Sequence, residues 1–389
     1  MMPEEKNMNV LKISLDINLL KQTQIEDNDA IERRILLARG VTNLFVIVYS
    51  TEPQKKPFTP IENLKIYSTA SINKITRPLD AIQIGKNICS THKIDLITTQ
   101  DPFFTGWAGM RLAKKFGIPL NVQLHADCIG NLLWLHERPL NRLMNAISKR
   151  VLKKADSFRV VSGWEKRKLV RLGYPAEKIR VIPEGINTEK FTAADGRTIR
   201  TQYQKAGYDK ILFFAGRITA QKNLPMLLRS FKMVVKEFPK AVLLMAGKGE
   251  GTDHLIKLSK NLAIDENVKF IGAIPYTEMP HYFAAADIFV LSSNYEGNAR
   301  VMMEASVIGV PIVSTKVSGA DEVVKNGING FIVEVGDTEA FTQRLLDVLN
   351  DERIRERCAG LRPEMIETFG RLRHIEQMHR LWRETVKEK

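Results

Sequence analysis

At 389 residues the chain is too long for one ordinary hydrophobic core, so we expect two domains. Its composition, 44% hydrophobic and 26% charged, is that of a soluble globular protein, and it has no apolar run of the roughly 18 residues that a membrane-spanning helix needs. The net charge of +14 predicts a surface that attracts anions, whether lipid, nucleic acid or phosphorylated substrate.

The first half of the chain alternates short apolar runs with longer connections that are typical of helices. We expect six strands here, at 10–15, 44–49, 94–98, 120–125, 158–162 and 179–183. Strands that alternate with helices in this way predict a parallel sheet covered on both faces.

The alternation stops in a loop-like stretch at 183–191 and then begins again. The second set of expected strands is 211–215, 241–246, 268–271, 288–291, 311–314 and 331–334. Two doubly wound sheets joined near 190–205 are therefore predicted, with ligands beyond the carboxyl ends of their strands. The last stretch, 372–386, predicts an amphipathic helix whose apolar side carries Ile375, Met378, Leu381 and Trp382.

Two glutamates flank a predicted loop in the second half. Glu296 lies in the loop that follows the strand at 287–291, and Glu304 lies in the helix predicted at 301–308. Both carboxylates come close to a helix N-terminus, where backbone N–H groups favour an anion such as phosphate. Because carboxylates repel phosphate, we expect them to accept hydroxyl groups attached to that phosphate, as in a sugar and a ribose.

Two cations follow the strand predicted at 211–215. Gly216 lets the chain leave the strand, Arg217 lies at its tip, and Lys222 precedes the next helix. This arrangement predicts a diphosphate clamp, and the alternative is a pair of solvated surface charges. The A-G-K-G-E-G stretch (246–251) is either a simple turn or a further wall of the same crevice.

The N-terminus and the cysteines bear on location. The first residues, M-M-P-E-E-K-N-M, are charged and lack the apolar core of a secretory signal. Cys89, Cys128 and Cys358 are far apart and have no metal-binding spacing. We therefore expect a reducing compartment, most simply the cytoplasm.

Taken together, these motifs resemble those of the family 4 retaining glycosyltransferases. The resemblance rests on stretches in a fixed order and is strongest between about 155 and 350: I-P-E-G-I-N-T-E-K-F (182–191), F-A-G-R-I-T-A-Q-K-N (214–223), F-I-G-A-I-P (270–275), E-G-N-A-R-V-M-M-E-A-S-V-I-G-V-P-I-V (296–313) and N-G-I-N-G-F-I-V (326–333). It implies an α/β protein of the GT-B fold, with two Rossmann-like, doubly wound domains facing a central cleft. The implied domains are an acceptor-binding domain at 1–190 and a nucleotide-sugar-binding domain at 191–368, with a helix at 369–389 crossing back to the first.

The resemblance also implies roles for single residues. Arg217 and Lys222 match the cations that neutralise the leaving diphosphate. Glu296 matches an acid that contacts the donor sugar, and Glu304 matches one that holds the ribose hydroxyls. His125, at the tip of a first-domain strand, matches a histidine that faces the donor sugar, although a lone histidine on an apolar strand is otherwise a core residue.

Backbone positions complete the implied donor site. Gly216 belongs to it, as does a loop whose main chain approaches the sugar and phosphate, formed by Gly297, Asn298 and Ala299. Ala273 and Ile274 lie where the family holds the base. The implied catalytic residues are therefore His125, Arg217, Lys222 and Glu296, with no metal site.

The implied reaction is metal-independent transfer of a hexose from a nucleotide-diphosphate sugar, such as a UDP- or GDP-sugar, with retention of configuration. The leaving diphosphate takes the proton of the acceptor, so no carboxylate nucleophile is needed. The acceptor would be a glycan or a lipid-linked group in cell-surface polysaccharide or glycolipid synthesis. The donor is a co-substrate, no cofactor is expected, and the enzyme would be cytoplasmic, at the inner face of the membrane where its acceptor is lipid-linked.

Two features depart from this pattern or compete with it. The loop at 17–28 has no glycine where the family often has a glycine-rich loop. It ends in Asp27-Asn28-Asp29, which resembles the metal-binding D-x-D of another glycosyltransferase fold but precedes a helical stretch, so we expect it to cap that helix.

Two other functions stay open. One is an altered chemistry, such as that of an epimerase or a phosphorylase, which the missing glycine loop would favour. The other is a basic nucleic-acid-binding protein, which would explain the charge but not the donor-site motifs; we expect no nucleic-acid partner because basic and aromatic residues are not interleaved.

The basic charge is concentrated in one segment. Residues 139–180 hold twelve basic and three acidic residues, a net charge of +9. In a helix at 140–154, one face would carry Leu140, Leu143, Met144, Ile147 and Val151, with Arg142, Lys149 and Lys153 opposite. This opposite face is either an ordinary solvated surface or a patch that meets an anionic membrane surface.

Overall fold

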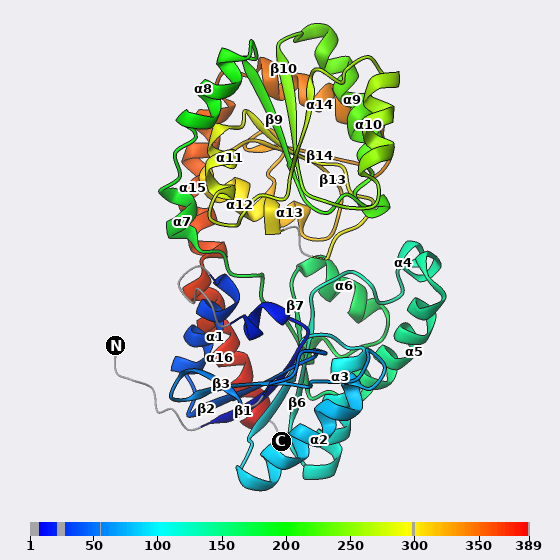
Figure 1. Cartoon of the computed structure of the whole chain (residues 1–389), viewed down its shortest axis with the longest axis vertical. Coiled ribbons are helices and arrows are strands. Elements are labelled where there is room, and N and C mark those ends of the chain that lie inside the picture. Colours follow the sequence, from blue (N-terminus) through cyan, green and yellow to red (C-terminus); the bar gives the residue numbers. More distant parts are fainter. Residues whose placement is uncertain (1–7, 22–27, 55, 298–299, 388–389) are drawn as a thin grey trace. The chain divides into compact units, whose positions relative to one another are not determined.

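Figure 1 shows the computed structural model, which describes all residues except 1–7, 22–27, 55, 298–299 and 388–389. The contacts divide the chain into two compact units. Unit 1 holds Met1–Pro183 and His374–Lys389, and unit 2 holds Glu184–Arg373. Each unit is built on its own sheet, so each is described by itself.

The sheet of unit 1 has eight strands in the order β3-β4-β2-β1-β5-β6-β7-β8 within the part of the chain that the structure describes. Neighbouring strands pair in parallel, except that β3 and β4 are antiparallel. The strands are β1 (Asn9–Ser14), β2 (Asn43–Val48), β3 (Phe58–Ile61), β4 (Leu64–Ser68), β5 (Leu96–Thr99), β6 (Leu120–Leu124), β7 (Ser157–Val160) and β8 (Ile179–Val181).

Strands β3 and β4, at one side of the sheet, were missed by the sequence prediction, and β3 adds one antiparallel edge strand to the predicted parallel sheet. β4 alternates buried Leu64 and Ile66 with partly exposed neighbours, so it lacks the continuous apolar run of the central strands. β3 contains Pro60, which a strand tolerates at a sheet edge.

Both faces of the unit 1 sheet are covered, as the prediction required. Val10, Leu44 and Val46 belong to one apolar cluster, which includes residues of α1 (Asp29–Arg39) and α16 (Arg371–Lys387). The intervening Leu11 and Phe45 belong to a second cluster on the other face. That cluster includes residues of helices α2 (Arg77–Thr91), α3 (Phe104–Phe116), α5 (Pro139–Lys154) and α6 (Gly163–Arg171).

The last helix, α16, begins at the end of unit 2 and returns to unit 1. Its predicted apolar side is confirmed, because Ile375, Met378, Leu381 and Trp382 are all buried, with Trp382 fully inaccessible. The helix therefore completes the core of the first unit although it is last in the sequence.

Helix α5 has the predicted length but not the predicted orientation. Leu140 and Leu143 are 50% and 55% exposed. The side chains buried on this helix are Asn141, Ser148, Val151 and Leu152. The expectation that the leucine face packs inward is wrong for the first half of the helix, because Asn141 turns inward instead and donates a hydrogen bond to the Trp134 carbonyl at 2.6 Å.

Unit 2 has a parallel sheet of six strands in the order β11-β10-β9-β12-β13-β14, counted over its described residues. The strands are β9 (Lys210–Ala215), β10 (Ala241–Ala246), β11 (Val268–Gly272), β12 (Ile288–Leu291), β13 (Ile312–Thr315) and β14 (Gly330–Val333). All six were predicted to within one residue at either end.

Helices lie on both faces of this sheet (Figure 1). One group is α9 (Leu224–Glu237), α10 (Thr252–Asn261) and α14 (Thr338–Asn350). The other is α7 (Thr188–Thr192), α8 (Arg197–Lys205), α11 (Met279–Ala285), α12 (Arg300–Ile308) and α15 (Ile354–Phe369). A single apolar cluster runs through both layers.

Short elements complete the chain: α4 (Leu132–Glu137), α13 (Ala320–Val323) and the 3-10 helices η1 (Ile17–Leu20), η3 (Ala176–Lys178) and η4 (Ala220–Lys222). Among the described residues, we find no helix with both the length and the apolar character to cross a bilayer.

Candidate active site

The strand order of unit 2 creates a crevice at the carboxyl edge of its sheet. From β9 the chain passes to β10 and β11 on one side, and β12 then pairs on the other side of β9. The loops after β9 and β12 therefore leave in opposite directions, which is where open α/β sheets bind ligands. Lys222 follows β9 and Glu296 follows β12, so both predicted site residues lie at this switch point.

Lys222 and Glu296 form a buried ion pair. The Lys222 Nζ lies 2.5 Å from the Glu296 Oε1, and the two residues are only 8% and 6% exposed. Ser293 donates a second hydrogen bond to the same oxygen at 2.5 Å. The predicted diphosphate cation and the predicted sugar-binding acid are thus direct neighbours and compensate each other's charge.

Hydrogen bonds hold together the two loops that carry this pair. The Ser292 hydroxyl donates to the Lys222 carbonyl at 2.8 Å, and the Gln221 side chain donates to the Tyr295 carbonyl at 2.9 Å. Asn223 ends η4 with a φ of 44° and starts α9. Lys222 is therefore fixed between a strand tip and a helix N-terminus, as predicted.

Arg217 lies at the tip of β9 and is exposed. Its backbone is held by the glycine loop after β10, because the Gly216 N–H donates to Ala246 at 2.9 Å and the Ile218 N–H donates to Lys248 at 3.0 Å. A Cβ on Gly247 would lie 1.8 Å from the Gly216 oxygen. The stretch 246–251 is thus a turn whose glycines let it pack directly on the Arg217 segment, and its place in the wall of the crevice stays a prediction.

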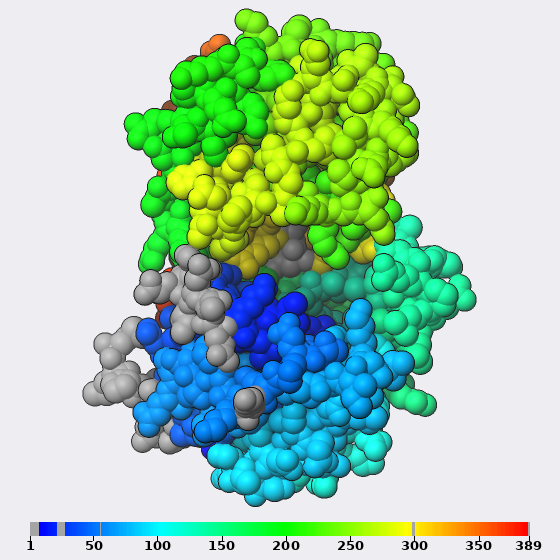
Figure 2. All heavy atoms as spheres, in the orientation of Figure 1, coloured from blue at the N-terminus to red at the C-terminus, as the bar shows by residue number. Residues whose placement is uncertain are grey.

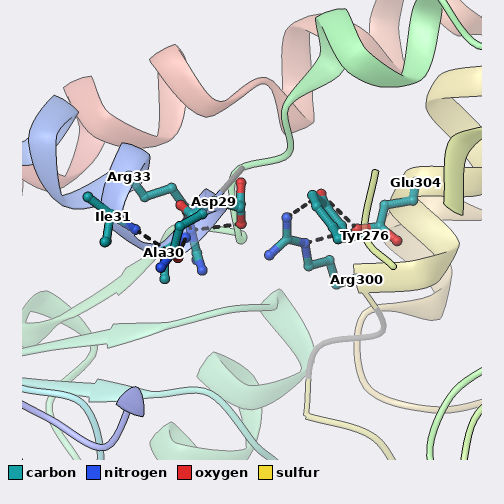
Figure 3. A network of polar contacts seen from close by, with 8 residues as sticks. Asp29, Ala30, Ile31, Arg33, Tyr276, Arg300 and Glu304 are labelled. Carbon is teal, nitrogen blue, oxygen red and sulfur yellow. Dashed lines mark hydrogen bonds and ion pairs between the residues drawn. The ribbon is translucent and has the colours of Figure 1, made fainter. Parts of the chain in front are cut away.

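Glu304 lies in a second polar cluster, on α12. Figure 3 shows Arg300, Tyr276 and Glu304 joined to one another by polar contacts. The Arg300 Nε donates to the Glu304 Oε1 at 3.0 Å, and its Nη2 donates to the Tyr276 hydroxyl at 2.6 Å. The Tyr276 hydroxyl in turn donates to the same Glu304 oxygen at 3.3 Å.

Arg300 and Tyr276 were missed by the sequence reasoning. The spacing of Arg300 and Glu304, four residues apart on a helix, was the available signal for their ion pair. Glu304 is 3% exposed and the guanidinium also covers the Tyr276 ring, 5.1 Å from its centroid. The predicted ribose-binding acid is therefore buried and charge-compensated.

The predicted base-binding residues follow β11 at the same edge. Ala273 is exposed, whereas Ile274 is partly buried and packs on the core of unit 2. The Gly272 carbonyl accepts a hydrogen bond from the Gly247 N–H at 2.7 Å, which ties this tip to the glycine loop. Gly297 is buried beside Glu296, but the predicted Asn298 and Ala299 lie outside the described residues.

His125 belongs to unit 1, one residue beyond the end of β6. The Arg159 Nη1 lies 3.5 Å from its Nδ1, and the same group donates to the Gln123 side chain at 3.3 Å. Arg159 is 1% exposed and its Nε donates to the Ile182 carbonyl at 2.9 Å. Because a guanidinium only donates, this contact requires that the His125 Nδ1 accept.

Two buried acids of unit 1 have shifted pKa values with structural causes. Burial raises the pKa of Glu165 to about 8, against the opposing hydrogen bond from the Val161 N–H. Burial likewise raises the pKa of Asp101 to about 6, opposed by hydrogen bonds from the first turn of α3. Both side chains hold a helix start, so we assign them no chemical role.

The D-N-D tripeptide is a helix cap, as predicted, in the part of it that is described. The Asn28 side chain accepts hydrogen bonds from the N–H groups of Ala30 and Ile31 at 3.2 and 3.4 Å. Asp29 pairs with Arg33 at 3.2 Å (Figure 3). Asp27 and half of the loop without glycine, residues 22–27, lie outside the described residues, and η1 begins that loop.

Comparison with known proteins finds two family models in consecutive halves of the chain. The model of group 1 glycosyl transferases matches residues 195–360, and that of Glycosyltransferase Family 4 matches residues 36–190. Together they cover most of the chain, including every predicted site residue.

Curated relatives are similar over part of their length. A GDP-mannose-dependent alpha-(1-6)-phosphatidylinositol monomannoside mannosyltransferase of Mycolicibacterium smegmatis is 28% identical over 53% of this chain and 56% of that protein. The capsular polysaccharide biosynthesis glycosyltransferase CapM of Staphylococcus aureus is 32% identical over 44% of this chain and 45% of that protein. The chain thus spans about half the length of these relatives.

Among solved structures, a sucrose-phosphate synthase of Thermosynechococcus elongatus superposes with a TM-score of 0.84. The superposition covers 98% of this chain and 100% of that one at 20% identity. The fold prediction of two Rossmann-like domains is confirmed.

Proposed function

We propose a specific reaction for this chain, which belongs to the group 1 glycosyltransferases of the GT-B fold: it transfers a hexose from a nucleotide-diphosphate sugar to a glycan or lipid-linked hydroxyl, with retention of configuration. The observation that carries the proposal is the Lys222–Glu296 pair at the switch point of the unit 2 sheet. This pair places one cation and one hydroxyl acceptor side by side where such sheets bind ligands.

Each member of the pair has capacity for a second partner. An ammonium has three donors, so Lys222 can contact Glu296 and a diphosphate oxygen at once. A carboxylate can accept several hydrogen bonds, so Glu296 can hold sugar hydroxyls besides Lys222 and Ser293. Arg217, exposed at the neighbouring strand tip, is the second cation for the diphosphate.

Glu304 is assigned to the ribose hydroxyls, and Ala273 and Ile274 to the base. All three come from the same edge of the unit 2 sheet, after β11 or on the helix after β12. Gly216 and Gly297 are assigned to main-chain contacts with the phosphate and the sugar; the sequence motif adds Asn298 and Ala299, which lie outside the described residues.

His125 is assigned to the donor sugar. With its Nδ1 accepting from Arg159, the proton of a neutral imidazole is on Nε2, which can then donate to a sugar oxygen. Arg159 is thus a positioning residue for this histidine.

In the proposed reaction, the bond between the anomeric carbon and the diphosphate oxygen breaks while the acceptor oxygen approaches the same face of the sugar. The acceptor hydroxyl gives its proton to the departing phosphate oxygen and forms the new bond to the anomeric carbon. Lys222 and Arg217 stabilise the charge that develops on the diphosphate, and we assign no step to a metal ion.

The names of two relatives and the state of the cysteines bear on the acceptor and the location. The mycobacterial relative is named for a phosphatidylinositol mannoside and the staphylococcal one for capsular polysaccharide, so we place this reaction in cell-surface glycolipid or polysaccharide synthesis. The three cysteines are unpaired, which fits a reducing cytoplasm, and the lipid-linked acceptor would bring the enzyme to the inner membrane surface.

The test is nucleoside diphosphate release from UDP-, GDP- and ADP-sugars, with and without lipid-linked acceptors. We expect the wild type to turn over sugars of one nucleotide class. The turnover rate of Lys222→Ala with that donor should be more than about 100-fold lower, as for loss of one oxyanion donor. Glu296→Ala should lose turnover as well. A Lys222→Ala or Glu296→Ala variant as active as the wild type would refute the site assignment, and salt-dependent binding of arbitrary DNA without any turnover would favour the nucleic-acid alternative.

A further inference from the structure

A surface cavity of about 480 Å³ lies in unit 1, outside the candidate active site. It is bounded by the second half of α5 and by the segment 172–178 that follows α6. Its apolar wall includes Leu152 and Phe158, which are 2% and 1% exposed, and Tyr174, whose ring meets Phe158 edge-on at 6.0 Å. Leu152 and Phe158 belong to the apolar core of unit 1, so this wall of the cavity is part of that core.

Three lysines and no acid line this cavity among the described residues. Lys149 and Lys153 lie one helical turn apart on α5, and Lys178 lies at the end of η3. The Lys178 ammonium donates to the Ala155 carbonyl at 3.2 Å, which holds it at the cavity and leaves its charge uncompensated by that contact. An apolar wall beneath three ammonium groups fits a ligand that is both anionic and apolar.

Exposed leucines continue the apolar surface away from the cavity. Leu132 and Leu133, in the first turn of α4, are 69% and 56% exposed, and Leu172, which lines the cavity, is 50% exposed. The Gly130 N–H donates to the Asn145 side chain at 3.3 Å, which places the start of α4 beside the middle of α5. Figure 1 shows α4 and α5 together at one margin of unit 1, and Figure 2 shows the same teal segment at the surface.

Large exposed apolar side chains with lysines beside them are typical of surfaces that enter the interface of a membrane. A soluble phosphorylated metabolite would use the lysines but would leave the leucines without a role. A protein partner would bury the leucines but has no specific need for a three-lysine cavity. The combination therefore favours a lipid.

We propose that this cavity and the leucines beside it dock the protein on a membrane by binding a lipid with a phosphate headgroup. The headgroup phosphate contacts Lys149, Lys153 and Lys178, and the lipid carbons lie along Leu152, Phe158 and Leu172. The inference deepens the proposed function, on which it rests, by assigning which surface meets the membrane that carries the acceptor.

The experiment measures co-sedimentation of the full-length protein with vesicles. Vesicles of phosphatidylcholine with phosphatidylglycerol are compared with vesicles of phosphatidylcholine alone. Lys149→Gln/Lys153→Gln should lower the partition coefficient on anionic vesicles about 30-fold, because each lysine near an anionic surface is worth about 1 kcal/mol. The matched control Lys114→Gln/Lys115→Gln removes two exposed lysines from α3 and should change partition less than about threefold.

A second pair of variants tests the leucines. Leu132→Ser/Leu133→Ser should reduce binding more than about tenfold, since burying a leucine side chain is worth at least about 1.5 kcal/mol. Ile72→Ser/Ile75→Ser removes two side chains that are 93% and 85% exposed elsewhere in unit 1, and it should leave binding unchanged. All these positions are exposed, so the melting temperatures should agree with that of the wild type.

Several results would overturn the inference. Equal losses of vesicle binding in the two lysine variants would mean that binding follows net charge and not this cavity. Unchanged binding of the Leu132→Ser/Leu133→Ser variant would refute insertion of these leucines into the membrane. Saturable binding of glycerol phosphate or inorganic phosphate at the cavity without vesicle binding would identify a soluble ligand instead. Donor turnover is scored separately: vesicle binding with the expected pattern but no turnover would refute the proposed reaction alone, and turnover without vesicle binding would refute the docking site alone.

Discussion

The Lys222–Glu296 pair gives the sharpest prediction, because its effect on the free energy of unfolding and its effect on turnover can be measured separately. Lys222→Met keeps the length of the apolar stem and removes the charge that faces Glu296. The carboxylate then remains 6% exposed with Ser293 as its nearest donor. Removing one partner of a buried ion pair costs about 3–5 kcal/mol, so we expect a loss of that size in the free energy of unfolding.

The double variant Lys222→Met/Glu296→Gln removes both charges while leaving an amide that Ser293 can still donate to. We expect it to recover about 2 kcal/mol of the stability lost in Lys222→Met, because no uncompensated charge remains. Urea unfolding of the wild type, the single variants Lys222→Met and Glu296→Gln, and the double variant measures both values. Lys316→Met is the matched control, since Lys316 and Glu334 are paired at 2.7 Å but are 53% and 71% exposed, and it should cost less than about 1 kcal/mol.

Turnover should follow a different pattern in the same cycle. Loss of one cation that stabilises the leaving group costs about 2.7–4 kcal/mol of transition-state stabilisation, so Lys222→Met should lower kcat about 100- to 1000-fold. The double variant should be more stable yet no more active. Recovery of turnover in the double variant would refute the reasoning, because Lys222 would then serve only to neutralise Glu296; a Lys222→Met protein as stable as the wild type would show that the pair is not energetically buried.

Three further variants test other parts of the two units. Gly247→Ala should lower both stability and donor affinity, because its φ of 145° and a Cβ 1.8 Å from the Gly216 oxygen force the strand tips apart. Gly336→Ala is the control, since Gly336 has a φ of 86° and nothing within 4 Å of an added Cβ. It should show the backbone strain alone, about 1–3 kcal/mol in urea unfolding. Arg300→Leu should weaken nucleoside diphosphate binding in calorimetry and Arg300→Lys should restore most of it, since the buried Glu304 carboxylate needs a neighbouring cation. Glu165→Gln should flatten the pH dependence of stability. In the wild type the pKa of Glu165 is raised from 4.5 to about 8, so the folded state binds more protons than the unfolded state between these pH values. The melting temperature of the wild type should therefore fall relative to that of the variant as pH rises through that window.

The sequence predicted the features that depend on one strand or one helix at a time. The central strands are continuous apolar runs because both faces of their sheets are covered, and such runs are visible without a structure. Lys222 and Glu296 were placed in the loops that follow two of these strands, and parallel pairing brings such loops to one edge of the sheet. Their 2.5 Å contact follows from the strand order, in which β12 pairs with β9.

The features that the sequence did not predict depend on contacts between elements. A cation four residues before an acid, as Arg300 is before Glu304, is common on solvated helices and does not by itself indicate a site. The contact of Arg300 with Tyr276 arises only in the fold. The inward face of α5 was misjudged because Asn141, a polar residue, is satisfied by the Trp134 carbonyl of the preceding helix. Periodicity reports which residues are apolar, and it does not report which polar residues will find a partner.

The returning helix α16 shows why such partners matter for the candidate site. Its Thr385 bonds to Ser157 of β7 at 2.6 Å, and Ser157 in turn accepts from Asn121 of β6 at 2.8 Å. Thr98 of β5 donates to Asn121 at 2.9 Å and accepts from the Gln123 side chain at 3.0 Å. These buried polar residues replace the apolar ones expected on central strands, and each is costly unless the whole chain of bonds is complete.

The same hydrogen-bond chain continues to the candidate catalytic histidine. Gln123 accepts from Arg159, and Arg159 lies against His125 at the strand tip. Two donor groups of the buried Arg159 are used in this way, Nη1 by Gln123 and Nε by the Ile182 carbonyl, which offsets part of the cost of burying this charge. The last helix of the chain therefore does more than cover an apolar face: through Thr385 it supplies one end of the polar network whose other end sets the orientation of His125.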